Sequence, residues 1–393
     1  VPGGKYYVTR NNTSILAFKV GTKLDNYSFN IVTSHTDSPT FKVKENAEIE
    51  VKNKYTQLNT EGYGGMLCAT WLDRPLSIAG RVLVSEGNSI VTKLLNIDRD
   101  LLMIPNVAIH MNRAANDGFK YNLQVDMLPL LSAGDDRQKD FKQIIADELG
   151  VKKEDILGHD LYLYNRMAPS IWGANEEFIS AGHLDDLQCG FASLKALLAG
   201  YNDESIDIMA CFDNEEVGSG TKQGADSTLL RDTLIRINSA LGKTEEDYHR
   251  ALASSFMLSA DNAHAVHPNH PEHTDATNCT YMNEGVVVKS HAGQKYTSDG
   301  VSMAVVKALA SGADVPLQYF ANRSDKAGGS TLGNIAMAQA SMNAVDIGLP
   351  QLAMHSSYET AGIKDTYYAI TLMKALFDSH IQETSTHSLE IKR

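Results

Sequence analysis

Two adjacent glutamates follow an apolar stretch near the middle of the chain. Glu215 and Glu216 come directly after residues 206–212, a run that is typical of a buried strand. Carboxylates crowded at a strand end are destabilising unless a positive charge neutralises them. A divalent metal would supply that charge, with one glutamate as a ligand and the other as a base toward water. A solvated acidic turn is the alternative for an isolated pair.

Other segments place metal-ligand side chains beside apolar stretches in the same way. Residues 30–34 lead to His35, whose ring can bind a metal while Asp37 accepts the other ring proton. The remaining candidates are His183, Asp185 and Asp186, then Asp261 and His264, and finally His355. Taken singly, each also fits an ordinary role as a core histidine, a helix N-cap or a turn residue.

Convergence of these segments would create a metal centre. In an open parallel sheet, ligand-binding groups gather beyond the carboxyl ends of the strands. Two His, two Asp and one Glu without a thiolate suit zinc first, with manganese or cobalt as alternatives. Five ligands are too many for one open zinc site. We therefore expect a carboxylate shared by two metal ions about 3.5–4 Å apart.

The elements that must position these groups alternate between strand and helix patterns in the C-terminal half. Strands are predicted at 206–212, 256–260, 286–288 and 317–320, and helices at 186–200, around 301–309 and at 365–379. In the first helix, one face carries Leu187, Phe191, Leu194 and Leu198. This alternation predicts an α/β fold with a mostly parallel central sheet covered by helices on both faces.

The pattern changes between about Glu48 and Trp172. Short strands are separated there by turn residues such as Gly64-Gly65 and Asn116-Asp117-Gly118. We predict an inserted β-rich domain over residues 48–172, within a domain formed by 1–47 and 173–393. The polar tail from residue 382 is expected to be loosely ordered.

Charge and cysteine usage exclude several functions. The 393 residues carry a net charge of −13, which argues against nucleic-acid binding and against docking on anionic membranes. No apolar run approaches the roughly 20 residues of a membrane span. The four scattered cysteines predict reduced thiols in a cytoplasmic protein. The chain contains no G-x-S-x-G elbow, which disfavours a serine hydrolase.

A histidine tract follows the predicted strand 256–260. Its members recur at three-residue spacing and are His264, His267, His270 and His273. Pro268 and Pro271 forbid an α-helix through the tract, so the spacing does not create one helical face. We expect mostly loop there, with His264 bordering the site and able to contact substrate.

Motifs along nearly the whole chain resemble the aspartyl aminopeptidase family of dinuclear zinc metallopeptidases. The set SHTDSP, GHLDD, DNEEVGS, SADNAHAVHPN and QLAMHS occurs in the order typical of that family, and further matches are PGGKYYVTRN, YGGMLCATWLDRPLSIAGRV, IPNVAIHMNR and VVVKSHAGQKYTSDG. The resemblance implies an α/β/α peptidase domain interrupted by a β-rich dimerisation domain. It also implies homodimers that assemble into tetrahedral homododecamers with active sites facing an internal chamber.

The resemblance assigns ligands to two metal ions. His35, Asp185 and Asp261 would hold one ion, while Asp185, Glu216 and His355 would hold the other, with Asp185 bridging. The peptide bond after Asp185 is typically cis in relatives.

The resemblance also assigns residues to catalysis and substrate binding. Glu215 would be the general base, and His110 would reach across the dimer interface into the neighbouring active site. Lys289 would contact an acidic side chain of the substrate. Near the last ligand, relatives often read MHSIRE where this chain has Ser357-Tyr358-Glu359, a difference that bears on substrate preference.

The expected function is removal of an N-terminal Asp or Glu from peptides. Three alternatives remain: a neutral, leucine-cleaving aminopeptidase, an amidohydrolase or carboxypeptidase with a similar core, and a non-catalytic metal-binding scaffold. Lys289 argues against the first, and the long gap between His35 and Asp185 argues against the second. Glu215 beside the full ligand set argues against the third.

Overall fold

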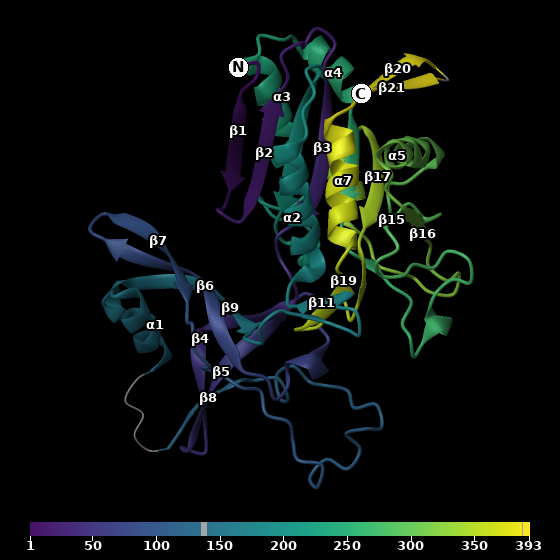
Figure 1. Cartoon of the computed structure of the whole chain (residues 1–393). Coiled ribbons are helices and arrows are strands. Elements are labelled where there is room, and N and C mark those ends of the chain that lie inside the picture. Colours follow the sequence, from purple (N-terminus) through teal and green to yellow (C-terminus); the bar gives the residue numbers. More distant parts are fainter. Residues whose placement is uncertain (135–139, 387) are drawn as a thin grey trace. The chain divides into compact units, whose positions relative to one another are not determined.

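The computed structural model describes residues 1–134, 140–386 and 388–393, and the chain divides into two compact units (Figure 1). The first unit consists of Val1–Ser38, Ser170–Met354 and Glu359–Arg393. The second consists of Pro39–Pro169 and His355–Tyr358. The predicted boundary at residue 48 falls inside strand β4 (Thr40–Val51).

A mixed sheet forms the centre of the first unit. Its strands, in spatial order, are β1 (Lys5–Arg10), β2 (Ser14–Val20), β12 (Ser205–Phe212), β3 (Ser28–His35), β13 (Phe256–Ala260), β17 (Asn343–Gly348), β15 (Val286–Lys289) and β16 (Leu317–Phe320). The middle strands β12, β3, β13 and β17 are parallel to one another, whereas β2 is antiparallel to β12 and β15 is antiparallel to β17. The predicted α/β class with a separate β-rich domain is confirmed.

Helices cover both faces of this sheet. One face packs against α2 (Leu184–Ala199), α5 (Gly300–Ala313) and α7 (Asp365–Phe377), and the other against α3 (Leu229–Ala240), α4 (Glu245–Ala253) and α6 (Leu332–Gln339). Strand alternation explains the two cores: in β3, Ile31 faces one core and Val32 the other. Figure 1 shows α2 and α7 side by side on their face.

The apolar stripe predicted on α2 is its exposed face. Leu187, Phe191, Leu194 and Leu198 are all exposed. The face packed on the sheet carries smaller residues, including Cys189, Ala192 and Ala196. Small side chains let the helix approach the sheet closely, which the spacing of the larger residues could not reveal.

Two smaller sheets complete the first unit. One contains β10 (Ser170–Trp172), β11 (Phe178–Ala181), β19 (Glu359–Gly362), β18 (Pro350–Leu352) and β14 (Ala263–His264). The other is a hairpin of β20 (His380–Ser385) and β21 (Ser388–Lys392). The prediction of a loosely ordered tail is therefore wrong for these strands, because Ile381 and Ile391 pair across the hairpin and pack on the core.

The second unit is built on an antiparallel sheet. Its strands, in spatial order, are β7 (Ser89–Asn96), β6 (Leu76–Glu86), β9 (Ile156–Asn165), β4, β5 (Tyr55–Tyr63) and β8 (Leu130–Ala133). Helix α1 (Phe141–Leu149) contributes to its core, where Phe41 and Trp71 pack edge to face. Within the part of the chain that the structure describes, none of the helices combines the length and apolar character needed to span a bilayer.

Candidate metal centre

Three neighbouring parallel strands end at the same edge of the central sheet. His35 is the last residue of β3 and pairs in register with Phe212, the last residue of β12. On the other side of β3, strand β13 ends at Ala260, directly before Asp261. The chain therefore brings Asp261 and the Glu215–Glu216 turn to the edge where His35 lies, as expected for a parallel sheet.

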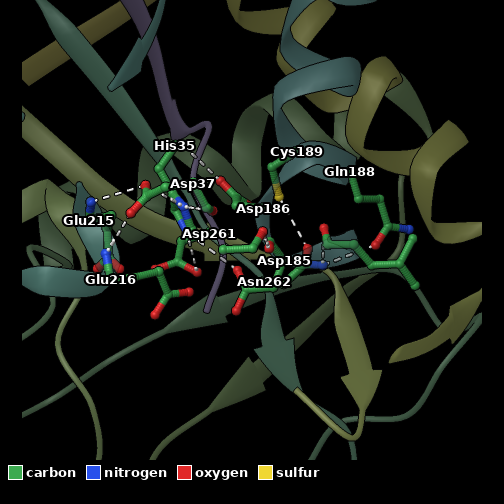
Figure 2. Close-up of polar contacts among 12 residues, drawn as sticks. His35, Asp37, Asp185, Asp186, Gln188, Cys189, Glu215, Glu216, Asp261 and Asn262 are labelled. Atoms are coloured by element: carbon green, nitrogen blue, oxygen red, sulfur yellow. Dashed lines mark hydrogen bonds and ion pairs between the residues drawn. The ribbon is translucent and has the colours of Figure 1, made fainter. Parts of the chain in front are cut away.

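The His35 ring is oriented by Asp37. Its Nδ1 lies 3.0 Å from the Asp37 carbonyl oxygen and 3.4 Å from the Asp37 carboxylate. The carbonyl, rather than the predicted carboxylate, is thus the nearer acceptor. With the proton on Nδ1, Nε2 is directed at carboxylate oxygens of Asp185 at 3.4 Å and Asp261 at 3.9 Å. Figure 2 shows these side chains converging.

The Asp37 carboxylate holds the turn that carries the two glutamates. Its oxygens accept hydrogen bonds from the backbone N–H groups of Glu215 and Glu216, both at 3.1 Å (Figure 2). The turn η3 (Glu215–Val217) lies between Asn214 and Gly218, both with positive φ. Residues tolerant of this conformation permit a tight turn. Sequence reasoning missed this role of Asp37, because it depends on β3 and β12 being neighbours.

The start of α2 delivers Asp185 and Asp186. The peptide bond between them is cis, as the resemblance implies. The Asp185 N–H donates to the Glu359 carboxylate at 3.0 Å. Asp186 is completely buried, and its carboxylate accepts a hydrogen bond from the His35 N–H at 3.1 Å. Asp186 thereby ties the end of β3 to α2, a role that the sequence did not indicate.

Lys289 lies beside Asp261. Its Nζ is 3.9 Å from an Asp261 carboxylate oxygen and donates to the Asn262 carbonyl at 3.0 Å. Lys289 is only 3% exposed, and its charge lies beside the Asp261 carboxylate in this buried position. A Cβ on Gly348 would lie 2.1 Å from the Asp261 carbonyl oxygen and 3.0 Å from Lys289 Cε, so this close approach requires glycine.

Burial raises the pKa values of the carboxyl groups. The pKa of Asp261 is raised to about 6, that of Glu215 to about 8 and that of Glu216 to about 10, with burial the largest cause and nearby carboxylates adding to it. Burial lowers the pKa of His35, but hydrogen bonds to neighbouring carboxylates outweigh it and leave that pKa well above its ordinary value. Protons and a divalent cation compete for these ligand atoms, so the cluster is suited to a cation.

The donor set fits zinc. Within the first unit, ligand atoms around His35 lie within 4.8 Å of one another in two groups, namely His35, Asp185, Asp186 and Asp261, and His35, Glu215 and Glu216. His35, Asp185 and Asp261 are 1%, 2% and 7% exposed, so water competes little for them. An imidazole with several carboxylates suits zinc, manganese or cobalt. The nearby Cys189 thiol instead donates to the Asn262 side chain at 3.2 Å.

A family model described as "Aminopeptidase I zinc metalloprotease (M18)" matches residues 1–377 of this chain. The chain belongs to the M18 family. It is accordingly a zinc-dependent metalloaminopeptidase, an exopeptidase that removes N-terminal residues.

Individual M18 proteins are similar over most of the chain. A probable M18 family aminopeptidase 2 from Clostridium novyi is 47% identical over 382 residues, covering 96% of this chain and 88% of the relative. A cryo-EM structure of the Ape4 and Nbr1 complex matches with a TM-score of 0.92 and 35% identity over 96% of this chain and 77% of that one. The S. cerevisiae mApe1 dodecamer matches with a TM-score of 0.81 and 28% identity, covering 95% and 85%.

The remaining candidates of this M18 chain are His264 in the first unit and His110 and His355 in the second. His264, in β14, is exposed and its ring packs edge-on to Phe320 at 6.1 Å. His355 belongs to the second unit, where its Nδ1 donates to the Gly65 carbonyl at 2.9 Å. His110 lies exposed in a loop of the same unit. The first unit thus brings together His35, Asp37, Asp185, Glu215, Glu216 and Asp261, with Lys289 alongside.

Proposed function

We propose that this M18 enzyme removes an N-terminal Asp or Glu from peptides at a dinuclear zinc centre. The observation that carries the proposal is the buried His35–carboxylate cluster beside the paired glutamates. His35, Asp185 and Asp261 would hold one ion. Asp185, Glu216 and His355 would hold the other. Manganese or cobalt would suit the same donors.

Glu215 is the general base of the proposed reaction. Zinc, when bound, lowers the pKa of water and polarises a carbonyl group. Glu215 takes the proton from the attacking water and then returns it to the leaving amine. The two hydrogen bonds from the glutamate backbone to Asp37 hold Glu215 and Glu216 in fixed directions. One glutamate can therefore serve as a ligand while its neighbour remains available for the proton.

The acidic preference is proposed from Lys289. Its ammonium is the cation adjacent to Asp261, in a buried position where a charge-assisted contact is strong. A side-chain carboxylate on the first substrate residue would find its charge partner there. A neutral aminopeptidase is the second candidate, because Lys289 already contacts Asp261 and the Asn262 carbonyl.

Assembly is proposed to complete the site. His110 lies in an exposed loop beside Val107, Ile109 and Met111, which are 53%, 44% and 85% exposed. Apolar side chains gathered on an exposed loop are typical of an interface. We therefore place this loop at a homodimer contact through which His110 reaches the neighbouring active site. The similarity to the mApe1 dodecamer supports assembly of such dimers into a homododecamer.

Glu215→Gln tests the catalytic proposal. The amide keeps the size of the side chain but cannot take the proton. We expect kcat for an N-terminal Asp peptide to fall by about 10²–10⁴-fold, the usual contribution of a general base, with zinc content unchanged. Glu245→Gln is the matched control, since Glu245 is an exposed glutamate in α4. Full activity of Glu215→Gln, or loss of zinc together with activity, would contradict the assignment of Glu215 as base.

A further inference from the structure

A second group of metal-ligand side chains lies on the surface of the first unit. The exposed histidine cluster consists of His270, Glu272 and His273, whose ligand atoms lie within 4.8 Å of one another. His270 Nδ1 is 3.1 Å from a Glu272 carboxylate oxygen. Among the described residues, this is the one group of three potential ligands that shares no member with the buried centre.

A short 3₁₀ turn creates the exposed histidine cluster. The prolines that forbid an α-helix are compatible with η4 (Pro271–His273), which begins with Pro271 directly after His270. His270 itself has an irregular backbone conformation, and only the three residues after it form the turn. The rings of His270 and His273 stack with centroids 5.3 Å apart and planes 20° apart. The three-residue spacing thus brings these two side chains together without an α-helix.

The turn is held in place by a neighbouring loop. The Arg323 guanidinium donates a hydrogen bond to the Glu272 carbonyl and forms an ion pair with Asp325 at 2.8 Å. Arg323 thus contacts the Glu272 backbone, while the Glu272 carboxylate contacts His270.

We propose that the exposed histidine cluster is a separate binding site for one divalent transition-metal ion, with zinc as the best match. Two imidazole nitrogens and a carboxylate oxygen form a ligand set typical of zinc, and water completes the coordination. Calcium and magnesium prefer oxygen ligands and suit it poorly. The exposed pair of His249 and Glu245, 3.8 Å apart, illustrates the usual surface arrangement, in which only two such groups meet.

The cluster also borders a cavity of about 250 Å³. His273 lines this cavity together with His264, Phe320 and Leu352. An ion held by His270 and His273 would connect the residue before η4 to the last residue of η4. It would thereby fix one part of the cavity wall. The proposed ion would therefore stabilise this loop, and it shares no ligand with the buried centre.

Metal counting on the zinc-loaded holoenzyme tests the proposal. Wild type and a variant carrying both His270→Ala and His273→Ala are dialysed against the same free zinc concentrations, and zinc per chain is measured by mass spectrometry. We expect the double variant to bind one equivalent less than wild type. His249→Ala is the matched control, because His249 is an exposed histidine of α4, outside the cluster, that lies 3.8 Å from Glu245. His249→Ala should bind as many equivalents as wild type.

Two results of this metal counting would overturn the proposal. One is equal zinc content in wild type and the double variant at every free zinc concentration, and the other is loss of the same equivalent from His249→Ala. A zinc-soaked crystal of the holoenzyme gives an independent measurement that needs no variant. Anomalous density between His270, Glu272 and His273 is expected, whereas density at the buried centre alone would refute the surface site.

Discussion

The buried centre and the exposed histidine cluster use similar ligand chemistry in opposite surroundings. In the buried centre, the ligands arrive from separate elements: His35 ends β3, Asp185 opens α2 and Asp261 follows β13. In the exposed cluster, all three side chains come from four consecutive residues around one 3₁₀ turn. One arrangement exists only when the whole sheet is formed, whereas the other needs little more than a local turn.

Burial changes what a carboxylate requires. In the centre, burial raises the pKa of Glu216 to about 10 and that of Asp261 to about 6. In the exposed cluster the pKa of Glu272 is lowered, first by a hydrogen bond from its own backbone and then by contact with His270. A buried carboxylate thus needs a cation or a proton, while an exposed one is stable as an ion in water. Metal binding should therefore be coupled strongly to folding only at the buried centre.

Removal of metal gives the largest expected effect. A ligand present at about 1,000 times its dissociation constant stabilises a folded protein by about 4 kcal/mol. Chelation should abolish activity and lower the free energy of unfolding, measured by urea titration, by an amount of that order. On chelation, the double variant of His270 and His273 should lose nearly as much free energy of unfolding as wild type, because only the surface ion is missing from it. If that variant lost most of the metal-dependent stability, the comparison between the two regions would fail.

Lys289→Met is expected to have the next largest effect. It removes the buried cation beside Asp261 while keeping a side chain of similar length. A hydrogen bond to a charged group contributes about 1.5–3 kcal/mol, which corresponds to about 10–100-fold in kcat/KM. That loss is expected for N-terminal Asp substrates, with a much smaller change for Leu substrates. An equal loss of kcat/KM for Asp and Leu substrates would mean that Lys289 only positions Asp261. That result would favour the neutral aminopeptidase.

The sequence predicts the positions of the centre's side chains better than their contacts. An apolar run followed by a polar residue is a local pattern, and it places His35, Glu215 and Asp261 at strand ends. The link between the Asp37 carboxylate and the glutamate turn is not local. It arises because β12 lies beside β3, although about 170 residues separate the two strands along the chain. The role of Asp186 at the His35 backbone likewise depends on packing of α2 against β3.

The fold shows the same division. Alternating strands and helices predict the α/β class, and frequent turns predict the β-rich domain. Which face of α2 is buried cannot be predicted from its leucines, because close packing on the sheet selects Cys189, Ala192 and Ala196 instead. The spacing of the histidine tract was equally ambiguous, since an α-helix and a 3₁₀ turn place its side chains differently.

Asp207 separates the effect of burial from that of metal binding. It lies in β12, outside the metal-ligand groups, and its carboxylate accepts hydrogen bonds from Asn30 at 3.2 Å and Ser205 at 3.3 Å. Burial is the main cause that raises its pKa to about 8. If burial alone makes a carboxylate retain a proton, Asp207 should show that behaviour without any cation.

Asp207→Asn gives the smallest expected effect, and it acts through pH. Since the folded pKa of about 8 exceeds the unfolded value of about 3.9, the folded state binds this proton more tightly. Stability should therefore fall as pH rises between those values. The variant lacks this titration, so wild type should lose on the order of 1–3 kcal/mol more than Asp207→Asn between about pH 5 and 7. Urea unfolding of both zinc-loaded proteins measures that difference. Parallel stability curves would mean that Asn30 and Ser205 stabilise an ionised carboxylate, and burial alone would then not explain the raised pKa values of the centre.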